Sequence, residues 1–405
     1  MKRFPLHYQI LIAFILAVFT GIFLPTLVPY ITWMGTVFLR LLRMIIVPLI
    51  LSSIISGITS IGGTNKIGKL GLKTISYYLL TSILSITTGL VFVNLLKPGL
   101  GADVGLEKEV EGLGVASKSF GSTILNIIPE NIFQSLLAAE MLQIIFFAFL
   151  FGFFIMKTSR KSKEFLITLF DGVFEVMMKF TMFIIKLAPF GIFGIVAGVV
   201  VEQDNLGELI GSMGLYMLTV FIALLVHAAI SLPLLLRLIG KIKPLKHFQA
   251  MYTPLLTAFS TSSSSATLPL TINAVEQNSG VSNKVSSFTL PLGATINMDG
   301  TALYEIVAAI FIAQAYGMEL TITQQLLVVF TALLASIGAA GIPMAGLVMI
   351  SIVLSAIGLP LEGVGLILSV DRILDMFRTS VNVWSDTCGA AIIASSEGER
   401  LKVSK

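Results

Sequence analysis

Five side chains that could bind ions or charged ligands recur at helical spacing near the C-terminus. They follow one another at intervals of four, three, four and four residues, so a helix presents them on one face: Asp371, Asp375, Arg378, Asn382 and Asp386. The residues between them are mostly apolar, and ionised groups are costly to bury in apolar surroundings. The spacing predicts either a binding site or a ladder of salt bridges that only holds helices together.

The charge balance favours a site over a ladder. Arg372 flanks this face, so two bases stand against three acids and the charges do not cancel. The planar guanidinium of Arg378 suits a carboxylate, and a neighbouring aspartate such as Asp375 suits an ammonium group. Together they indicate a site for an acidic amino acid.

A second polar segment, Gly293–Thr301, has glycines on both sides of Asn297 and Asp299. This pattern predicts an unwound turn that leaves backbone carbonyl oxygens without helical partners. Carbonyl, carboxylate and hydroxyl oxygens are hard ligands that suit an alkali cation. A simple helix kink at Gly300 is the alternative.

The composition places these residues in a membrane protein. Of 405 residues, 56% are apolar and 12% are charged, and the mean hydropathy is +0.96; soluble domains carry roughly a quarter charged residues. The net charge of +4 is modest and spread over loops, which does not indicate nucleic-acid binding. The single Cys388 excludes an internal disulfide and a cysteine metal cluster.

The first half predicts six membrane-spanning helices, because a bilayer needs about 20 apolar residues. The uncharged or nearly uncharged segments that indicate them are Tyr8–Leu24, Tyr30–Gly62, Ile75–Leu96, Met141–Met156, Leu187–Val201 and Ile210–Leu236. Thirteen Lys and Arg residues precede helix 1 or follow helices 2, 4 and 6, against three in the alternate loops. The positive-inside rule therefore predicts cytoplasmic N- and C-termini. The first helix lacks a small-residue cleavage site, so we expect it to be retained.

The second half predicts two helical hairpins. Phe248–Val275 is split by a serine-rich run at 260–265, and Leu320–Leu361 is split at Ser336–Pro343. If the second segment formed two full spans, the loops after it would lie on the same side of the membrane as with a hairpin, so the charges of the loops do not distinguish the two. The short arms favour re-entrant hairpins. With helices at Val285–Tyr316 and Val364–Ser396, we expect an all-α membrane protein of eight transmembrane helices plus two re-entrant hairpins, arranged as inverted repeats.

Four runs carry a family resemblance that covers essentially the whole chain. Thr261–Pro269, Pro291–Glu305, Ala335–Pro343 and Asp371–Asp386 strongly resemble the glutamate transporter family of dicarboxylate and amino acid:cation symporters. That family includes archaeal aspartate transporters, bacterial glutamate symporters and animal excitatory amino acid transporters. The resemblance implies a homotrimer in the plasma membrane (the inner membrane of a bacterial cell), surrounded by lipid, in which a mobile domain moves substrate by an elevator motion.

The resemblance also implies a division of the chain. Residues 1–66 (helices 1 and 2) and 119–200 (helices 4 and 5) would form a trimeric scaffold. The transport domain would comprise residues 67–98 (helix 3) and 207–405. The second of these segments would hold helix 6, hairpin 1 (about 245–280), helix 7 (about 285–316), hairpin 2 (about 320–361) and helix 8 (about 364–396).

Residue roles follow from the resemblance by position. Arg378 would bind the side-chain carboxylate of the substrate, Asp375 its amino group, and Asn382 and Ser264 its main-chain carboxylate. The full set of expected substrate-binding residues is Ser262, Ser264, Met298, Thr301, Gly341, Ile342, Asp375, Arg378, Thr379 and Asn382.

The resemblance further implies up to three sodium ions and a proton. The first sodium would bind Asp386, Asn382 and the carbonyls of Gly293 and Asn297. The second would lie between Thr295 and Ser336, Ile337 and Ala339. The third would use Asp299, Asn297, Thr81, Ser82 and the Tyr78 carbonyl. Glu305 would carry the proton, because it is the one charge in Thr301–Ala315 and burial disfavours an ionised carboxyl. A carboxyl that only packs the helix is the alternative.

Some residues depart from the family pattern, which limits how far the roles of family residues can be assigned to this chain. Ser262 and Met376 stand where archaeal and animal members respectively place an arginine, and the spare arginine here is Arg372. His227 is expected to be a hydrogen-bonded packing residue and not a proton relay.

The sequence therefore predicts a symporter of L-glutamate, L-aspartate or both, driven by sodium and a proton. A C4-dicarboxylate symporter is the main rival, although those relatives lack the aspartate at the position of Asp375. A neutral amino acid carrier would replace Arg378. An enzyme is disfavoured, because no nucleophile–base pair is found.

Overall fold

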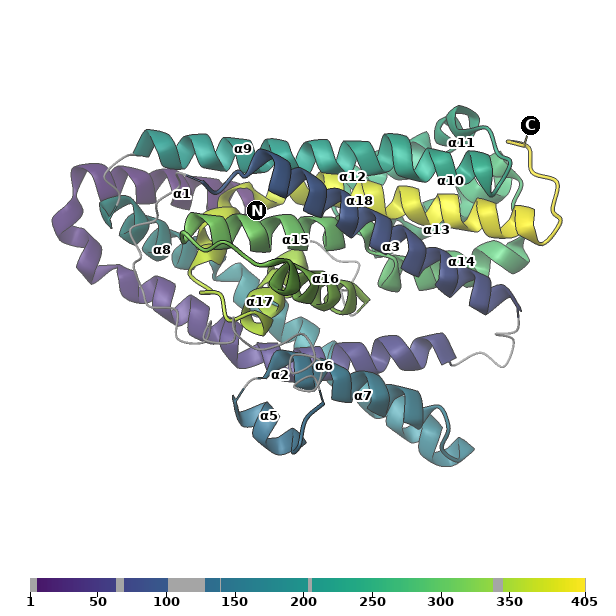
Figure 1. Cartoon of the computed structure of the whole chain (residues 1–405), viewed down its shortest axis with the longest axis horizontal. Coiled ribbons are helices and arrows are strands. Elements are labelled where there is room, and N and C mark those ends of the chain that lie inside the picture. The colour runs from purple at the N-terminus through teal and green to yellow at the C-terminus, as the bar shows by residue number, and fades with distance from the viewer. Residues whose placement is uncertain are drawn as a thin grey trace, which may run out of the picture.

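A computed structural model describes residues 6–62, 69–100, 128–138, 140–202, 206–337 and 345–404. The regular secondary structure of the described residues is helical, and they form no β-strand, apart from one isolated bridge between Ile242 and Ser404. The all-α class predicted from the sequence is confirmed for this part of the chain. Figure 1 shows α9 and α18 running along one edge of the molecule, with α2, α6 and α7 along the opposite edge.

The N-terminal half consists of helices whose bounds follow the apolar segments of the sequence. They are α1 (Leu6–Phe23), the 3₁₀ turn η1 (Pro25–Tyr30), α2 (Thr32–Gly62), α3 (Lys69–Leu96), α5 (Ile132–Ala138), α6 (Met141–Ile155), α7 (Arg160–Lys186) and α8 (Ala188–Glu202). Helix 5 of the sequence prediction is a bent pair, because α7 and α8 meet at 53°.

The C-terminal half contains the interrupted elements. They are α9 (Leu206–Val226), the π-helical turn η3 (His227–Ser231), α10 (Leu232–Leu238), α11 (Pro244–Ala250), α12 (Tyr252–Thr261), α13 (Ser264–Ala274), η4 (Val275–Ser279), α14 (Asn283–Ile296), α15 (Asp299–Ala315), α16 (Ile322–Ile337), α17 (Ala345–Ala356) and α18 (Gly363–Ser396).

Two of the predicted breaks are present in this half. α12 ends at Thr261 and α13 begins at Ser264, within the serine run. α14 gives way to α15 at Asn297 and Met298, which confirms an unwound turn and not a simple kink at Gly300. The predicted break at Ser336–Pro343 falls mostly on 338–344, which lie outside the described residues.

Four helical segments of the described chain are long and apolar enough to cross a membrane, and five if the bent α7–α8 pair counts as one span. α1, α6 and α16 are shorter apolar helices. α18 is not among the candidate spans, and it is the helix that carries the charged face.

Two groups of helices pack mainly within themselves. α2 packs against α6, α7 and α8, and α1 packs against α8. α15 and α18 pack against each other and against α9, while α3 packs on α15 and α12 packs on α18. α15 is enclosed almost completely, since 16 of its residues are buried. The polar residues of α15 and α18 therefore meet in the interior of the second group.

Candidate substrate and cation site

Arg378 on α18 is buried, with 1% of its surface exposed, and is paired with two aspartates of its own helix. Its Nη2 lies 2.9 Å from Asp375 Oδ1 and 3.0 Å from Asp371 Oδ1. Arg372 Nη1 lies 3.7 Å from the other oxygen of Asp375. The Nε and Nη1 atoms of Arg378 have no hydrogen-bond partner among the described residues. Buried donors without partners are unfavourable, so these two are available to a ligand carboxylate.

An aromatic ring fixes the plane of this guanidinium. The Arg378 Cζ atom lies 3.8 Å from the centroid of the Tyr304 ring on α15, a cation–π contact. The Tyr216 ring on α9 stacks on Phe311 of α15 at 4.5 Å between centroids. Tyr304 was not among the predicted site residues; its position one turn after Thr301 is the signal that could have found it.

Asn382 joins α18 to the start of α15. Its Oδ1 accepts a 2.7 Å hydrogen bond from the Gly300 backbone N–H, one of the donors that a helix N-terminus leaves without an intrahelical partner. Its Nδ2 lies 3.3 Å from Thr301 Oγ1 and 3.4 Å from Met298 Sδ. Three predicted substrate residues thus meet one turn from Arg378, and the predicted Thr379 is buried beside them on α18.

The tip of the first hairpin is a left-handed turn. Ser262 has φ 51° and ψ 37°, and the Ser263 hydroxyl caps α13 by accepting from the Ala266 N–H at 3.2 Å. Ser262 and Ser264 are buried, and Ser262 Oγ has no hydrogen-bond partner among the described residues. The predicted contacts Gly341 and Ile342 lie outside the described residues.

Asp386 lies against the break between α14 and α15. Asn297 Nδ2 donates to Asp386 Oδ1 at 2.9 Å, and the Asn297 backbone N–H bonds the Gly293 carbonyl at 2.9 Å. A Cβ atom at Gly293 would collide with the Asp386 carboxylate and lie 2.7 Å from Tyr78 Oη. Only glycine therefore lets the backbone come this close to the carboxylate.

Asp299 is held by side chains from three other helices. Ser82 on α3 donates to its Oδ1 at 2.9 Å, and Ser385 on α18 donates to its Oδ2 at 2.6 Å. His227 in η3 lies 3.3 Å from the same Oδ2 through Nε2. His227 is thus hydrogen-bonded, as predicted, although its partner is a candidate ion ligand. Ser385 was not predicted; it is adjacent to Asp386 in sequence.

Thr81 links the two aspartate environments. Its hydroxyl lies 3.2 Å from the Tyr78 carbonyl and 3.3 Å from Asn297 Oδ1. Ser385 also accepts from Asn297 Nδ2 at 3.0 Å. Apart from Asn382, which bonds to Met298, Gly300 and Thr301, the residues predicted for the first and third sodium ions therefore form one continuous hydrogen-bonded cluster.

The donor set of this cluster fits an alkali cation. Asp299 and Asp386 are 0% and 3% exposed, and no Lys or Arg of the described chain pairs with either. Buried carboxylates stay ionised only with a compensating positive charge. Their neighbours supply carboxylate, amide, hydroxyl and carbonyl oxygens, which are hard ligands. The described residues contain no group of three or more His, Cys, Asp and Glu placed to hold a metal.

The residues predicted for the second sodium ion are not all described. Thr295 is exposed and its hydroxyl donates to the Leu292 carbonyl at 3.0 Å. Ser336 is buried and donates to the Leu333 carbonyl at 2.9 Å. α16 ends at Ile337, and Ala339 lies outside the described residues.

Glu305 lies one residue beyond Tyr304, inside the enclosed helix α15. Its side chain is fully buried, and neither carboxyl oxygen has a hydrogen-bond partner among the described residues. An ionised carboxyl in that position would be strongly disfavoured, so Glu305 is a candidate to hold a proton.

The close approach of α15 and α18 gives a testable expectation. A Cβ atom at Gly300 would lie 2.5 Å from the Arg378 carbonyl oxygen and 3.0 Å from its Cα, and backbone atoms cannot move aside without shifting a helix. We expect Gly300→Ala to lower stability by about 1–3 kcal/mol and to weaken substrate binding. The measurement is the thermal unfolding midpoint in detergent, with and without substrate.

Gly172 in the middle of α7 is the matched control, because nothing lies within 4 Å of a Cβ built there. Gly172→Ala should leave the midpoint unchanged or raise it, since alanine favours a helix by roughly 0.5–1 kcal/mol over glycine. Equal midpoints for Gly300→Ala and wild type would show that the two helices are not in contact there.

Comparison with known proteins identifies the class. The chain matches the sodium:dicarboxylate symporter family over residues 6–396. It is 37% identical to an excitatory amino acid transporter of Caenorhabditis elegans over 91% of this chain and 82% of that protein. It is 35% identical to human excitatory amino acid transporter 3 over 100% and 89%, respectively. It is 36% identical to the proton/sodium-glutamate symport protein of Geobacillus stearothermophilus over 98% of this chain and 96% of that protein.

The chain therefore belongs to the sodium:dicarboxylate symporter family. It is an integral membrane transporter and not an enzyme, as the composition and the lack of catalytic motifs predicted.

Proposed function

We propose that this protein is a secondary-active symporter of L-aspartate, L-glutamate or both, coupled to sodium and a proton. The observation that carries the proposal is the buried Arg378, which has two available donors beside Asp375 and lies two turns from the oxygen cluster at Asp386. Relatives named for excitatory amino acid and proton/sodium-glutamate transport support it.

In this proposal the charged groups of the substrate bind side chains that form ion pairs with one another when no substrate is bound. Asp371 and Asp375 neutralise Arg378 when no substrate is bound, as buried charges require. The side-chain carboxylate of the substrate then binds the Arg378 fork, and its ammonium group binds Asp375. Asn382 and Ser264 hold the main-chain carboxylate, with contacts from Thr301 and Thr379.

Sodium would enter as a co-transported substrate. One ion would bind between Asp386, Asn382 and the Gly293 and Asn297 carbonyls, and another between Asp299, Ser82, Thr81 and the Tyr78 carbonyl. A third would lie beneath the second hairpin, near Thr295 and Ser336. No Lys or Arg of the described chain pairs with Asp299 or Asp386, and Asp299 has only His227 as an ion-pair partner, which supports the first two sites.

Glu305 would carry the proton, and Glu305→Gln tests this role. Gln mimics the protonated carboxyl, so the variant should still bind and exchange substrate. Its net uptake should no longer respond to a proton gradient, and its uptake should depend less on pH than that of wild type. The measurement is labelled aspartate uptake into proteoliposomes across a range of external pH, together with exchange against internal aspartate.

Wild type provides the comparison for this variant, because it should move protons only when substrate is present. Identical pH profiles for wild type and Glu305→Gln, with no substrate-dependent proton movement, would make this a sodium-only symporter.

The packing supports a division into scaffold and transport domains. α1, α2, α6, α7 and α8 pack mainly on one another, and α3 and α9 to α18 form the second group. We propose that the first group is the trimeric scaffold, and that the second moves across the plasma membrane as an elevator. Eight spanning helices, two re-entrant hairpins and cytoplasmic termini complete the proposal. The predicted boundaries at 66 and 119 lie outside the described residues.

The proposed function is tested by uptake under separate ion gradients. Purified protein in liposomes should accumulate labelled aspartate or glutamate when sodium is high outside, and an inward proton gradient should increase that uptake. Accumulation without sodium would contradict the proposed coupling.

A C4-dicarboxylate symporter remains the second candidate, in keeping with the name of the family. Asp375 argues against it, because a dicarboxylate brings no ammonium group to this buried carboxylate. Succinate should therefore be a poor substrate and a weak competitor of aspartate.

A further inference from the structure

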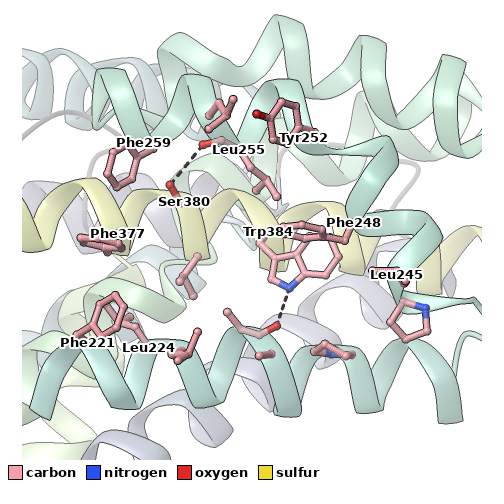
Figure 2. A pocket seen from close by; sticks show the side chains of 17 residues that line it. Phe221, Leu224, Leu245, Phe248, Tyr252, Leu255, Phe259, Phe377, Ser380 and Trp384 are labelled. Atoms are coloured by element: carbon pink, nitrogen blue, oxygen red, sulfur yellow. Dashed lines mark hydrogen bonds between the residues drawn. The ribbon is translucent and has the colours of Figure 1, made fainter. Parts of the chain in front are cut away.

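A large apolar groove lies on the far side of α18 from the candidate site. It runs between α9 with η3 and α10 on one side, α11 and α12 on the other, and α18 at its floor (Figure 2). Its volume is about 700 Å³, within the range of roughly 300–1,000 Å³ that small-molecule pockets occupy. The candidate site and the groove use alternate faces of one helix, because Phe377 and Val381 line the groove whereas Arg378 and Asn382 face α15.

The polar atoms on the floor of the groove are already bonded within the protein. Ser380 Oγ donates to the Met376 carbonyl at 3.0 Å and approaches the Leu255 carbonyl at 3.4 Å. Trp384 Nε1 donates to the Ala228 carbonyl at 3.0 Å (Figure 2). The floor therefore offers an occupant apolar contact and no donor in need of a partner.

The two ends of the groove differ in character. At one end the Phe377 ring packs edge-on against Phe221 and Phe259, each at 5.1 Å between centroids, and forms an apolar stop. The other end is lined by Pro244 and Leu245, with Phe248 beside Trp384 (Figure 2).

The end lined by Pro244 and Leu245, which we call the open end, is strongly basic. Lys243 and Lys246 flank Pro244 and Leu245 in sequence, and Arg237 and Lys241 precede them; all four are exposed. None of them takes part in an ion pair of the described chain, and the sequence has no Asp or Glu between Glu208 and Glu276. An occupant that matches both the apolar floor and the basic end of the groove needs a long apolar chain and an anionic head group.

We propose that this groove binds one anionic phospholipid, with an acyl chain against α18 and the phosphate on Lys243 and Lys246. The side walls are open to the surroundings, since Leu245, Phe248 and Leu256 are 69%, 48% and 47% exposed, so a chain can enter laterally from the bilayer. The proposed topology puts the lysines in the cytoplasm, where anionic lipids concentrate. The choice of leaflet rests on that topology; the binding itself does not.

The lipid would also support the hairpin that reaches the substrate. α12 lines the groove with Leu255 and Phe259 and ends next to the left-handed Ser262. A chain that fills the space between α9, α12 and α18 holds α12 in place. Bound phospholipid should therefore raise the thermal unfolding midpoint of the purified protein.

The headgroup contact is tested by native mass spectrometry of the purified full chain. The probes are phosphatidylglycerol and phosphatidylcholine with identical palmitoyl and oleoyl chains. Wild type should retain phosphatidylglycerol in preference. Lys243→Gln with Lys246→Gln should reduce its binding about fivefold per lysine and leave phosphatidylcholine binding unchanged. The matched pair Lys161→Gln with Lys163→Gln, at the start of α7, should have no effect.

The acyl-chain contact is tested by filling the groove. Ala229 lines it and the adjacent Ile230 does not, so Ala229→Trp should lose the retained lipid and its stabilisation, whereas Ile230→Trp should keep both. Leu256→Trp, on the opposite wall, repeats the test should Ala229→Trp fail to fold, which size-exclusion elution reports.

Retention of phosphatidylglycerol by the two groove-filling variants at the wild-type level would overturn the proposal. Equal retention of the two lipids by wild type would overturn it as well, leaving only an apolar contact with bulk lipid. Lipid retention is measured without substrate, so these outcomes do not depend on the transported molecule.

Discussion

Replacing Arg378 with Ala should abolish uptake of aspartate and glutamate. A hydrogen bond to a charged group contributes about 1.5–3 kcal/mol, and Arg378 has two buried donors, Nε and Nη1, without a partner in the described chain. Their loss would also leave the substrate carboxylate buried and unpaired, which costs more than the bonds themselves. We expect affinity to fall by at least about a hundredfold.

The same variant should retain a site for the common part of an amino acid. Asp375 and Asn382 remain, so serine or alanine should bind and exchange in Arg378→Ala. That gain is the folding control, because an unfolded protein binds neither. Competition against labelled serine and labelled aspartate measures both effects. Glutamate affinity equal to that of wild type would remove Arg378 from the substrate site.

Replacing Asp386 with Asn should weaken sodium-dependent substrate binding. Asn keeps the shape of the side chain and its hydrogen bond from Asn297 but loses a ligand charge. Mutating an outer-shell partner of a metal ligand typically changes the metal affinity by about 10–100-fold. Asp386 is proposed to contact the ion directly, so we expect the sodium concentration for half-maximal aspartate binding to rise by at least about tenfold.

Asp171→Asn, an exposed acid on α7, is the charge-matched control and should leave sodium dependence unchanged. Linkage requires sodium to raise substrate affinity by the same factor as substrate raises sodium affinity. Titration of sodium with and without aspartate checks both directions. Aspartate affinity that ignores sodium in wild type would contradict the proposed sodium sites.

The parts of the site that lie on single helices could be predicted from sequence. The face of α18 follows from the spacing of Asp371 to Asp386, and the break before α15 follows from the glycines around Asn297. Both signals are local, because helical periodicity and glycine backbone freedom act within a few residues.

The contacts between helices could not be predicted in the same way. Tyr304 over Arg378, Ser385 on Asp299 and His227 on Asp299 join residues that are far apart in sequence. Each depends on how helices cross, and an aromatic or a serine within an apolar helix gives no local sign of its partner. The bend between α7 and α8 was missed because α7 carries several charges and was not predicted as a helix. Only the apolar segment Leu187–Val201, which corresponds to α8, was predicted.

The groove behind α18 was missed for a related reason. Phe377, Val381 and Trp384 are ordinary apolar residues of a membrane helix, and only the arrangement of α9 and α12 around them leaves space between the helices. The lysines at its open end are visible in the sequence, where they indicate only membrane orientation.

The most direct test of the account is simultaneous uptake of radioactive sodium and labelled aspartate by the same proteoliposomes. Symport through the Arg378 and Asp386 sites predicts that sodium enters only when aspartate is outside, that aspartate enters only when sodium is outside, and that succinate replaces aspartate poorly. Sodium entry unaffected by aspartate, or aspartate accumulation in sodium-free medium, would contradict it.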